Sequence, residues 1–137
     1  MKFHISNKRP HAGEKGFSLL ELMIAMLIMI ILLSVAIPTY QRSVQAARET
    51  VLKENLWQMR RAIDQFSTDK GRLPSSVEDL VKEKYLREKP IDPILEKDEW
   101  DEVQGEDSSR PDAPSGLKDV KSLAEGDGSD GKAYNKY

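Results

Sequence analysis

The sequence predicts an α+β protein, in which one long N-terminal helix packs on a small antiparallel sheet. Residues 17–37 are strongly apolar with Glu21 as their one charged residue, and apolar residues then recur at helical spacing as far as residue 66. Beyond Gly71, prolines and glycines interrupt the chain so often that only a few short strands can form. We therefore expect four segments: a basic leader over 1–16, an apolar helix over 17–37, its amphipathic continuation over 38–71 and a small α+β head over 72–137.

The apolar run is the right length for a membrane helix. Its 21 residues would form a helix of about 31 Å, close to the thickness of a bilayer's hydrocarbon core. The alternative is a buried core helix, but too little chain remains to surround it. The leader has four basic residues and one acidic residue, whereas the rest has 17 basic and 22 acidic residues. Because positive charge stays on the cytoplasmic side, we expect a cytoplasmic N-terminus and an exported head.

The junction at Gly16-Phe17 differs from an ordinary signal peptide. A secretory signal is cut at small residues after its apolar region, whereas here Gly16 precedes the apolar run. Residues 16–23 read GFSLLELM, which resembles the prepilin motif of type IV pilins and type II secretion pseudopilins. The resemblance implies that a prepilin peptidase cuts after Gly16 and N-methylates Phe17. It also implies a role for Glu21 in assembly.

Glu21 is the informative residue of this segment. A carboxylate in an apolar zone is costly unless it is neutralised or paired, so an intramembrane acid indicates a function. The nearest cation of a cleaved chain would be the amine of Phe17, one helical turn away. By resemblance, the amine of a neighbouring subunit takes this role in a filament and sets its register. The alternative is that Glu21 lies near enough to the interface to stay hydrated.

The helix should continue beyond Pro38 with a kink, because proline removes a backbone donor and clashes with the preceding turn. Members of the resembled family commonly have a proline at this distance from the cut. Trp57 lies off the apolar stripe, so it could cover the edge of the domain or contact a neighbouring subunit. The stripe itself, read as the packing face of the head, consists of Val44, Ala47, Val51, Leu52, Leu56, Met59, Ile63 and Phe66.

The head should begin after Gly71, a natural helix stop. Ser75 and Glu78 form a capping-box pattern for a short helix that reaches about Lys84. The remaining elements that we expect are strands near 99–104 and 117–123, a loop over 105–116 and a further element near 133–134.

The order of features most resembles the G-type, or major, pseudopilins of type II secretion systems. The similar stretches are Gly-Arg-Leu-Pro at 71–74, Tyr-Leu at 85–86, Pro-Ile-Asp-Pro at 90–93, Trp100 and Asp-Gly-Ser-Asp-Gly at 127–131. The resemblance implies a homo-oligomeric periplasmic filament that drives protein secretion from the bacterial inner membrane. Its partners would be prepilin peptidase, other pseudopilins and the inner-membrane assembly platform. The alternative is a type IV pilin for adhesion, motility or DNA uptake, but the short, cysteine-free chain favours a pseudopilin.

The acidic, glycine-rich stretch near the C-terminus raises the question of calcium. Asp127 and Asp130 lie among glycines, and calcium prefers several oxygen ligands on a flexible loop. G-type pseudopilins are similar in having a calcium site in their last loop. The spacing is not that of an EF-hand, and the alternative is a flexible acidic tail.

Three other classes of function can be compared with the sequence. His4 and His11 both lie in the leader and the chain has no cysteine, so the cleaved chain would lack both residue types. We therefore expect no enzyme. The acidic head argues against binding of nucleic acid. A solitary membrane anchor that presents a binding head would need neither leader removal nor a pairing between Phe17 and Glu21.

Overall fold

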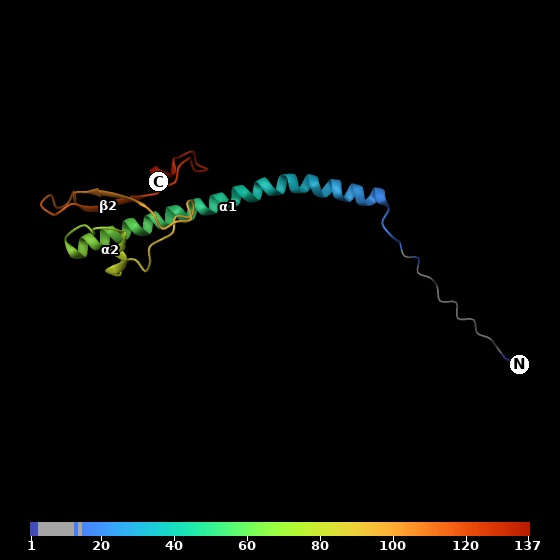
Figure 1. Cartoon of the computed structure of the whole chain (residues 1–137), viewed down its shortest axis with the longest axis horizontal. Helices are drawn as coiled ribbons and strands as arrows, with labels where there is room; N and C mark the ends of the chain where they lie inside the picture. Colours follow the sequence, from blue (N-terminus) through green and yellow to red (C-terminus); the bar gives the residue numbers. More distant parts are fainter. Residues whose placement is uncertain (3–12, 14) are drawn as a thin grey trace. The chain divides into compact units, whose positions relative to one another are not determined.

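The computed structural model describes residues 1–2, 13 and 15–137. Its elements are helix α1 (Leu19–Lys70), helix α2 (Val77–Lys82), strands β1 (Asp101–Gly105) and β2 (Gly116–Lys121), and the 3₁₀ helix η1 (Tyr134–Lys136). One long helix with a small antiparallel sheet confirms the expected α+β class (Figure 1). The chain divides into a first unit, Met1–Thr39, and a globular unit, Tyr40–Tyr137, which are described separately below.

Both ends of α1 are set by local chemistry. At the start, the Oγ of Ser18 accepts a hydrogen bond from the Glu21 backbone N–H at 3.1 Å, which is the geometry of an N-cap. At the end, Gly71 adopts φ +69° and donates its N–H to the Ser67 carbonyl at 3.0 Å. Glycine adopts this left-handed conformation without steric cost, so the predicted helix stop at Gly71 is confirmed.

Pro38 lies inside α1, which continues through it. Nearby hydroxyl groups are satisfied within the helix: Ser34 Oγ donates to the Ile31 carbonyl at 2.6 Å, and Thr39 Oγ1 donates to the Val35 carbonyl at 2.9 Å. Such internal bonding allows polar side chains in an apolar segment. The predicted kink at Pro38 stays a prediction.

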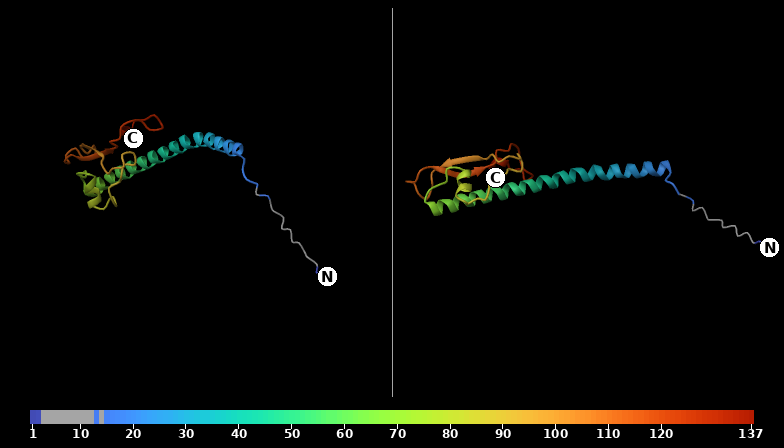
Figure 2. Two further views of the ribbon diagram at one scale, coloured as in Figure 1. Left: turned by 45° about the vertical axis from the view of Figure 1, so that its right-hand side comes forward. Right: turned by 60° about the horizontal axis from the view of Figure 1, so that its bottom comes forward.

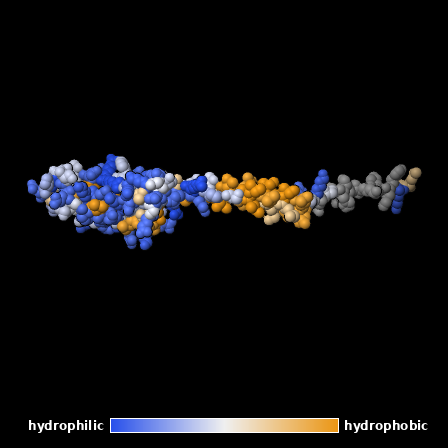
Figure 3. All heavy atoms as spheres, turned by 90° about the horizontal axis from the view of Figure 1, so that it is seen from above, coloured by the Kyte–Doolittle hydropathy of each residue, from blue (hydrophilic) through white to orange (hydrophobic). Residues whose placement is uncertain are grey.

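The first part of α1 exposes its apolar side chains. Every large apolar residue between Leu19 and Ile37 is exposed, as Figure 3 shows by the apolar side chains gathered along this stretch. The globular unit presents a mainly hydrophilic surface in the same view. Within the described ranges, α1 is the one helix long and apolar enough to cross a membrane.

The second part of α1 supplies the core of the globular unit. The sheet lies along this part of the helix in each view of Figure 2. The buried apolar residues are Leu52, Leu56, Met59, Ala62, Ile63 and Phe66 of α1, Val77 and Leu80 of α2, Leu117 and Val120 of β2, with Leu73, Trp100, Ala124 and Tyr134. The predicted stripe is therefore confirmed from Leu52 to Phe66. Ala47 and Val51 were wrongly included because both are exposed, Val51 to 49%, whereas Glu49 is buried.

Strands β1 and β2 pair antiparallel, with Asp101 opposite Lys121 and Gly105 opposite Gly116. An irregularity between Val103 and Gln104 shifts the register. A Cβ on Gly116 would lie 2.7 Å from the Leu73 Cβ and from the Pro74 carbonyl oxygen. Glycine is thus needed where β2 passes the turn before α2. Both strands occur where the sequence predicts them, with ends displaced by up to two residues.

The short helix differs from its prediction in two details. Its N-cap is Ser76, whose Oγ accepts from the Asp79 N–H at 3.3 Å, and not Ser75. The acid that accepts a backbone N–H at this helix start is Asp79, from Ser75 at 3.1 Å, whereas the Glu78 carboxylate pairs with Lys89 at 2.6 Å. The helix ends at Lys82 rather than Lys84, which has φ +64° and cannot continue it. The further element predicted near 133–134 is η1.

Candidate functional site

The predicted cleavage junction lies in exposed, non-helical chain. Gly16 and Phe17 precede the first helical residue of α1, and Phe17 is 82% exposed. A Cβ placed on Gly16 would meet no other atom within 4 Å. An exposed extended segment is the kind of backbone that a peptidase can bind. The structure is therefore compatible with cutting between these two residues, which stays a prediction.

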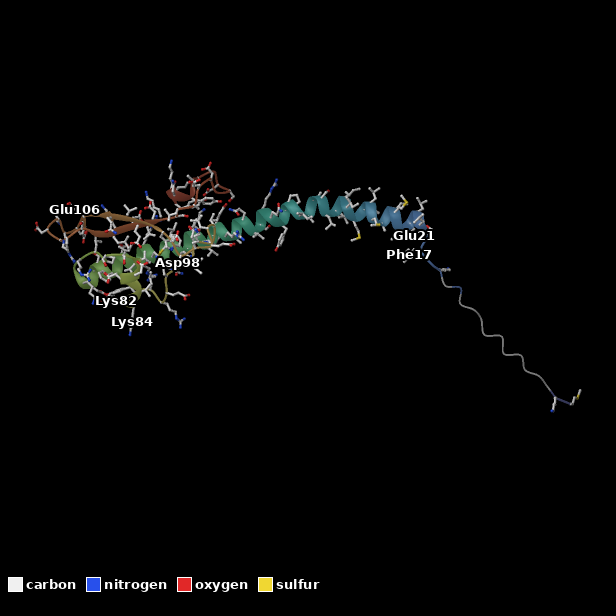
Figure 4. All side chains as sticks on the ribbon, viewed as in Figure 1. Phe17, Glu21, Lys82, Lys84, Asp98 and Glu106 are labelled. Carbon is white, nitrogen blue, oxygen red and sulfur yellow. The ribbon has the colours of Figure 1, made fainter. Side chains whose placement is uncertain are left out.

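Glu21 lies in the first turn of α1, at the same end of the helix as Phe17 (Figure 4). An acid in the first turn interacts favourably with the helix dipole. Ser18 and Glu21 also have capping-box spacing, a local signal that the sequence analysis missed. In the described residues, the Glu21 carboxylate has no hydrogen-bond or ion-pair partner.

A second cluster holds the C-terminal residues on α1, and its centre is the buried carboxylate of Glu49. This side chain accepts hydrogen bonds from the Ser129 N–H at 3.0 Å and from the Ser129 hydroxyl. The Tyr134 hydroxyl donates at 3.3 Å and the Gln45 amide at 3.5 Å. Donation by Ser129, above all, lowers the pKa of Glu49 below its usual 4.5. The carboxylate is therefore held ionised although only 4% of the residue is exposed.

Asp130 carries the second contact of this cluster. Its carboxylate accepts from the Tyr137 hydroxyl at 2.7 Å and the Lys132 N–H at 3.0 Å, and it pairs with Lys53 of α1 at 3.2 Å. These donors, the Tyr137 hydroxyl first, lower the pKa of Asp130 to about 2. The same hydrogen bond raises the pKa of Tyr137. The Lys53 ammonium also lies 4.5 Å from the centre of the Tyr137 ring.

Arg60 supplies the third contact from α1. Its guanidinium pairs with Asp119 at 2.7 Å and donates to the carbonyls of Val120 at 3.0 Å and Tyr137 at 2.7 Å. It thus joins the helix to β2 and to the last residue of the chain. We use the name C-terminal clamp for Glu49, Lys53 and Arg60 of α1 with Ser129, Asp130, Tyr134 and Tyr137.

The contacts of the clamp test whether Asp127 and Asp130 are arranged to bind calcium. The described part of the chain has no group of three acidic, histidine or cysteine side chains placed to hold a metal. Asp130 is surrounded by donors that include the Lys53 ammonium, a poor environment for a metal ligand. Asp127 contributes a backbone bridge to Ala133. This arrangement does not fit calcium at Asp127 and Asp130, and the site stays a prediction.

The clamp residues on α1 were not predicted from the sequence. Glu49 lies three positions before Leu52, on the same face of the helix as the predicted stripe. A lone acid at a core position was the available signal, because a buried carboxylate needs donors from elsewhere in the chain. Its donors are about eighty residues away in sequence, at Ser129 and Tyr134. Periodicity alone could not have identified them.

Comparison with known proteins gives two matches. Residues 11–37 match the family described as the prokaryotic N-terminal methylation motif. The chain is also similar to the competence protein ComGC of Halalkalibacterium halodurans, with 29% identity over 79 residues, which are 58% of this chain and 78% of that protein. No solved structure matches. The motif and the apolar helix support a membrane-anchored, pilin-like protein.

Proposed function

We propose that this chain is a non-enzymatic structural subunit of a pilin-like helical filament. The observation that carries the proposal is an N-terminal methylation motif followed directly by a helix whose apolar side chains are exposed from Leu19 to Ile37. Such a surface is unstable in water and needs an apolar environment. A bilayer supplies it before assembly, and the helices of neighbouring subunits supply it afterwards.

Glu21 gives this assembly a register. Cleavage after Gly16 creates an amine at Phe17, and a second subunit can place that amine against the Glu21 carboxylate. An ion pair formed away from water is strongly distance-dependent, so it favours one axial offset between subunits over others. Each subunit carries both the Phe17 amine and the Glu21 carboxylate, so the same pairing can repeat from one subunit to the next along a filament.

Two kinds of machine could use such a filament. The G-type features of the sequence favour type II secretion, in which the filament grows in the periplasm and moves exported proteins. The similarity to a competence protein favours a second candidate, a filament for DNA uptake. Deletion of the gene in its own organism would separate them, since one predicts loss of secreted proteins and the other loss of transformation.

The processing step is tested by intact mass and N-terminal sequencing of the membrane-expressed chain, with and without its prepilin peptidase. We expect a mature chain that begins with N-methyl Phe17. The Glu21→Ala variant should be cleaved normally but should yield about tenfold fewer filaments or none, as expected for loss of a buried charge pair. Glu88→Ala, which removes an exposed acid of the globular unit, is the matched control.

A chain that keeps its leader in the presence of the peptidase would contradict the proposal. So would filaments that form equally well without Glu21. Either result would favour the solitary membrane anchor that presents a binding head.

A further inference from the structure

Trp57 is an exposed tryptophan on the outward face of α1. It is 55% exposed, whereas its neighbours Leu56 and Met59 face the core and are buried. The guanidinium of Arg61 lies 5.2 Å from the centre of the Trp57 ring. Tryptophan and arginine together are enriched among the residues that dominate protein interfaces. This face of the helix therefore has the composition of an interface, and more than half of Trp57 remains uncovered in the described chain.

Trp57 lines two hollows of the surface. One, of about 340 Å³, is lined by Lys53, Leu56, Arg60, Asp130, Lys132 and Tyr137. The other, of about 260 Å³, is lined by Gln58, Arg61, Ala62, Gln65, Tyr85, Leu86 and Arg87. In the first hollow, Lys53 and Arg60 are already paired with carboxylates. In the second hollow, no acidic side chain is present.

Arg61 and Arg87 are exposed, and neither takes part in an ion pair within the described chain. We use the name tryptophan surface for Trp57, Arg61 and Arg87. It offers a flat aromatic ring with two cations beside it. An acidic segment with some backbone exposed is the complementary partner.

The same chain contains such a segment. Residues 98–107 hold six acidic side chains and no lysine or arginine. None of the six forms an ion pair with a described residue, and Asp98, Glu99, Asp101 and Glu106 are exposed. Figure 4 shows Asp98 and Glu106 towards opposite ends of this stretch. The six like charges outnumber the lysines near them, Lys121 opposite Asp101 and Lys89 beside Asp98 and Glu102, and such an excess favours a basic partner.

We propose that the tryptophan surface of one copy binds the acidic segment, residues 98–107, of a neighbouring copy. The inference rests on the filament proposed above and assigns a contact between its globular units. The two surfaces differ, so the contact is heterologous, the kind that produces open helical assemblies rather than closed dimers. A second copy is a better partner than nucleic acid, because the globular unit has 17 basic and 21 acidic residues and would repel a polyanion.

A charge swap in the full chain tests this contact, in cells that contain its peptidase and assembly proteins. The double variant Arg61→Glu/Arg87→Glu and the double variant Asp98→Lys/Asp101→Lys should each lower the yield of sheared filaments by about tenfold, as like charges then oppose each other. In a mixture of the two double variants, some neighbouring copies would still oppose like charges. A single chain that carries all four substitutions restores opposite charges at every contact, so it is the decisive variant. That chain should recover a yield within about threefold of wild type.

The matched control is Lys82→Glu/Lys84→Glu, which makes the same change of charge at two exposed lysines that line neither hollow beside Trp57. Figure 4 labels both lysines. It should leave the yield unchanged. A direct readout is the fluorescence of Trp57 in a Trp100→Phe background, since the sequence has two tryptophans and Trp100 is already buried. Its emission should move to shorter wavelength on assembly.

Three results would overturn the contact: no recovery in the fourfold variant, an equal loss in the control, or no change in Trp57 emission in assembled filaments. Intact filaments combined with lost retention of a labelled single-stranded DNA oligonucleotide by Arg61→Glu/Arg87→Glu would assign the surface to nucleic acid instead. Failure of the filament proposal is distinguishable, because the wild-type chain itself would then form none. Thermal unfolding of each solubilised variant controls for loss of the fold.

Discussion

The two parts of α1 differ in the exposure of their apolar side chains. In the first unit, Leu27 and its neighbours are half or more exposed, whereas Leu56 in the globular unit is 1% exposed. Both stretches are regular helix, so secondary structure alone does not decide burial. The second part of the helix finds its apolar partners within the same chain, in α2 and β2. The first part must find them elsewhere, in lipid or in other subunits.

The largest expected difference comes from the same substitution made in each part. Leu56→Ala should lower the free energy of unfolding of the globular unit by about 2–5 kcal/mol, because it leaves a cavity among close-packed side chains. Leu27→Ala should change that free energy by less than about 0.5 kcal/mol, because Leu27 has no contact in the core. Denaturant unfolding in detergent, followed by the fluorescence of the buried Trp100 in a Trp57→Phe background, measures both.

Equal losses of unfolding free energy in the two variants would contradict the difference between the two parts of α1. Leu27→Ala should instead act on assembly, because the proposed filament would bury that side chain against other helices. The yield of filaments is therefore the second measurement. Leu27→Ala should lower this yield although its globular unit unfolds like that of wild type.

The features predicted correctly from the sequence depend on local patterns. The apolar run, the stripe from Leu52 to Phe66 and the stop at Gly71 each depend on residues within a few turns. The cap of α2 was misplaced by one residue because two adjacent serines both have a suitable acid three positions later. In the structure Asp79 accepts from the Ser75 N–H and pairs with Arg72, whereas Glu78 pairs with Lys89. Both ion pairs involve residues outside the short helix, which capping rules do not include.

The clamp was missed for a related reason. Its residues on α1 are charged, and a charged residue in an amphipathic helix is assigned to the solvent face by default. Glu49 violates that rule because Ser129 and Tyr134 supply donors after the chain has folded back. The candidate residues Gly16, Phe17 and Glu21 could be identified in advance because their motif is continuous in sequence.

The second prediction concerns this clamp. Glu49→Gln should lower the free energy of unfolding by about 1–3 kcal/mol, since the amide cannot accept from all the donors that the carboxylate satisfies. Glu54→Gln, at an exposed position of the same helix, is the control and should be near neutral. Equal effects of the two substitutions would show that the buried position of Glu49 has no energetic consequence.

The same experiment separates the clamp from a bound ion. In wild type, excess calcium chloride and excess EDTA should give the same unfolding midpoint if the clamp alone holds the C-terminal residues. A calcium-dependent rise that disappears in Asp127→Ala and Asp130→Ala would establish the calcium site instead.

The smallest expected effect is the response of the clamp to acid. The pKa values of Glu49 and Asp130 are lower in the folded chain than their ordinary values of 4.5 and 3.8. Each carboxylate therefore stabilises the fold fully above its ordinary pKa, and this contribution is lost as the pH falls through the lowered value. For Asp130 the loss should fall between pH 3.8 and about 2. The effect is small because Asp130 and Lys53 are both partly exposed and solvent screens their attraction.

Thermal midpoints measured from above pH 4.5 downward would resolve the two contributions. Glu49→Gln should flatten the part of the profile that begins below 4.5, and Asp130→Asn the part below 3.8. The first unit offers the contrast, since substitutions there should leave the profile unchanged: Glu21→Gln lies outside the globular unit and takes no part in its unfolding. An acid response that disappeared in Glu21→Gln would mean that the two parts of α1 do not unfold independently.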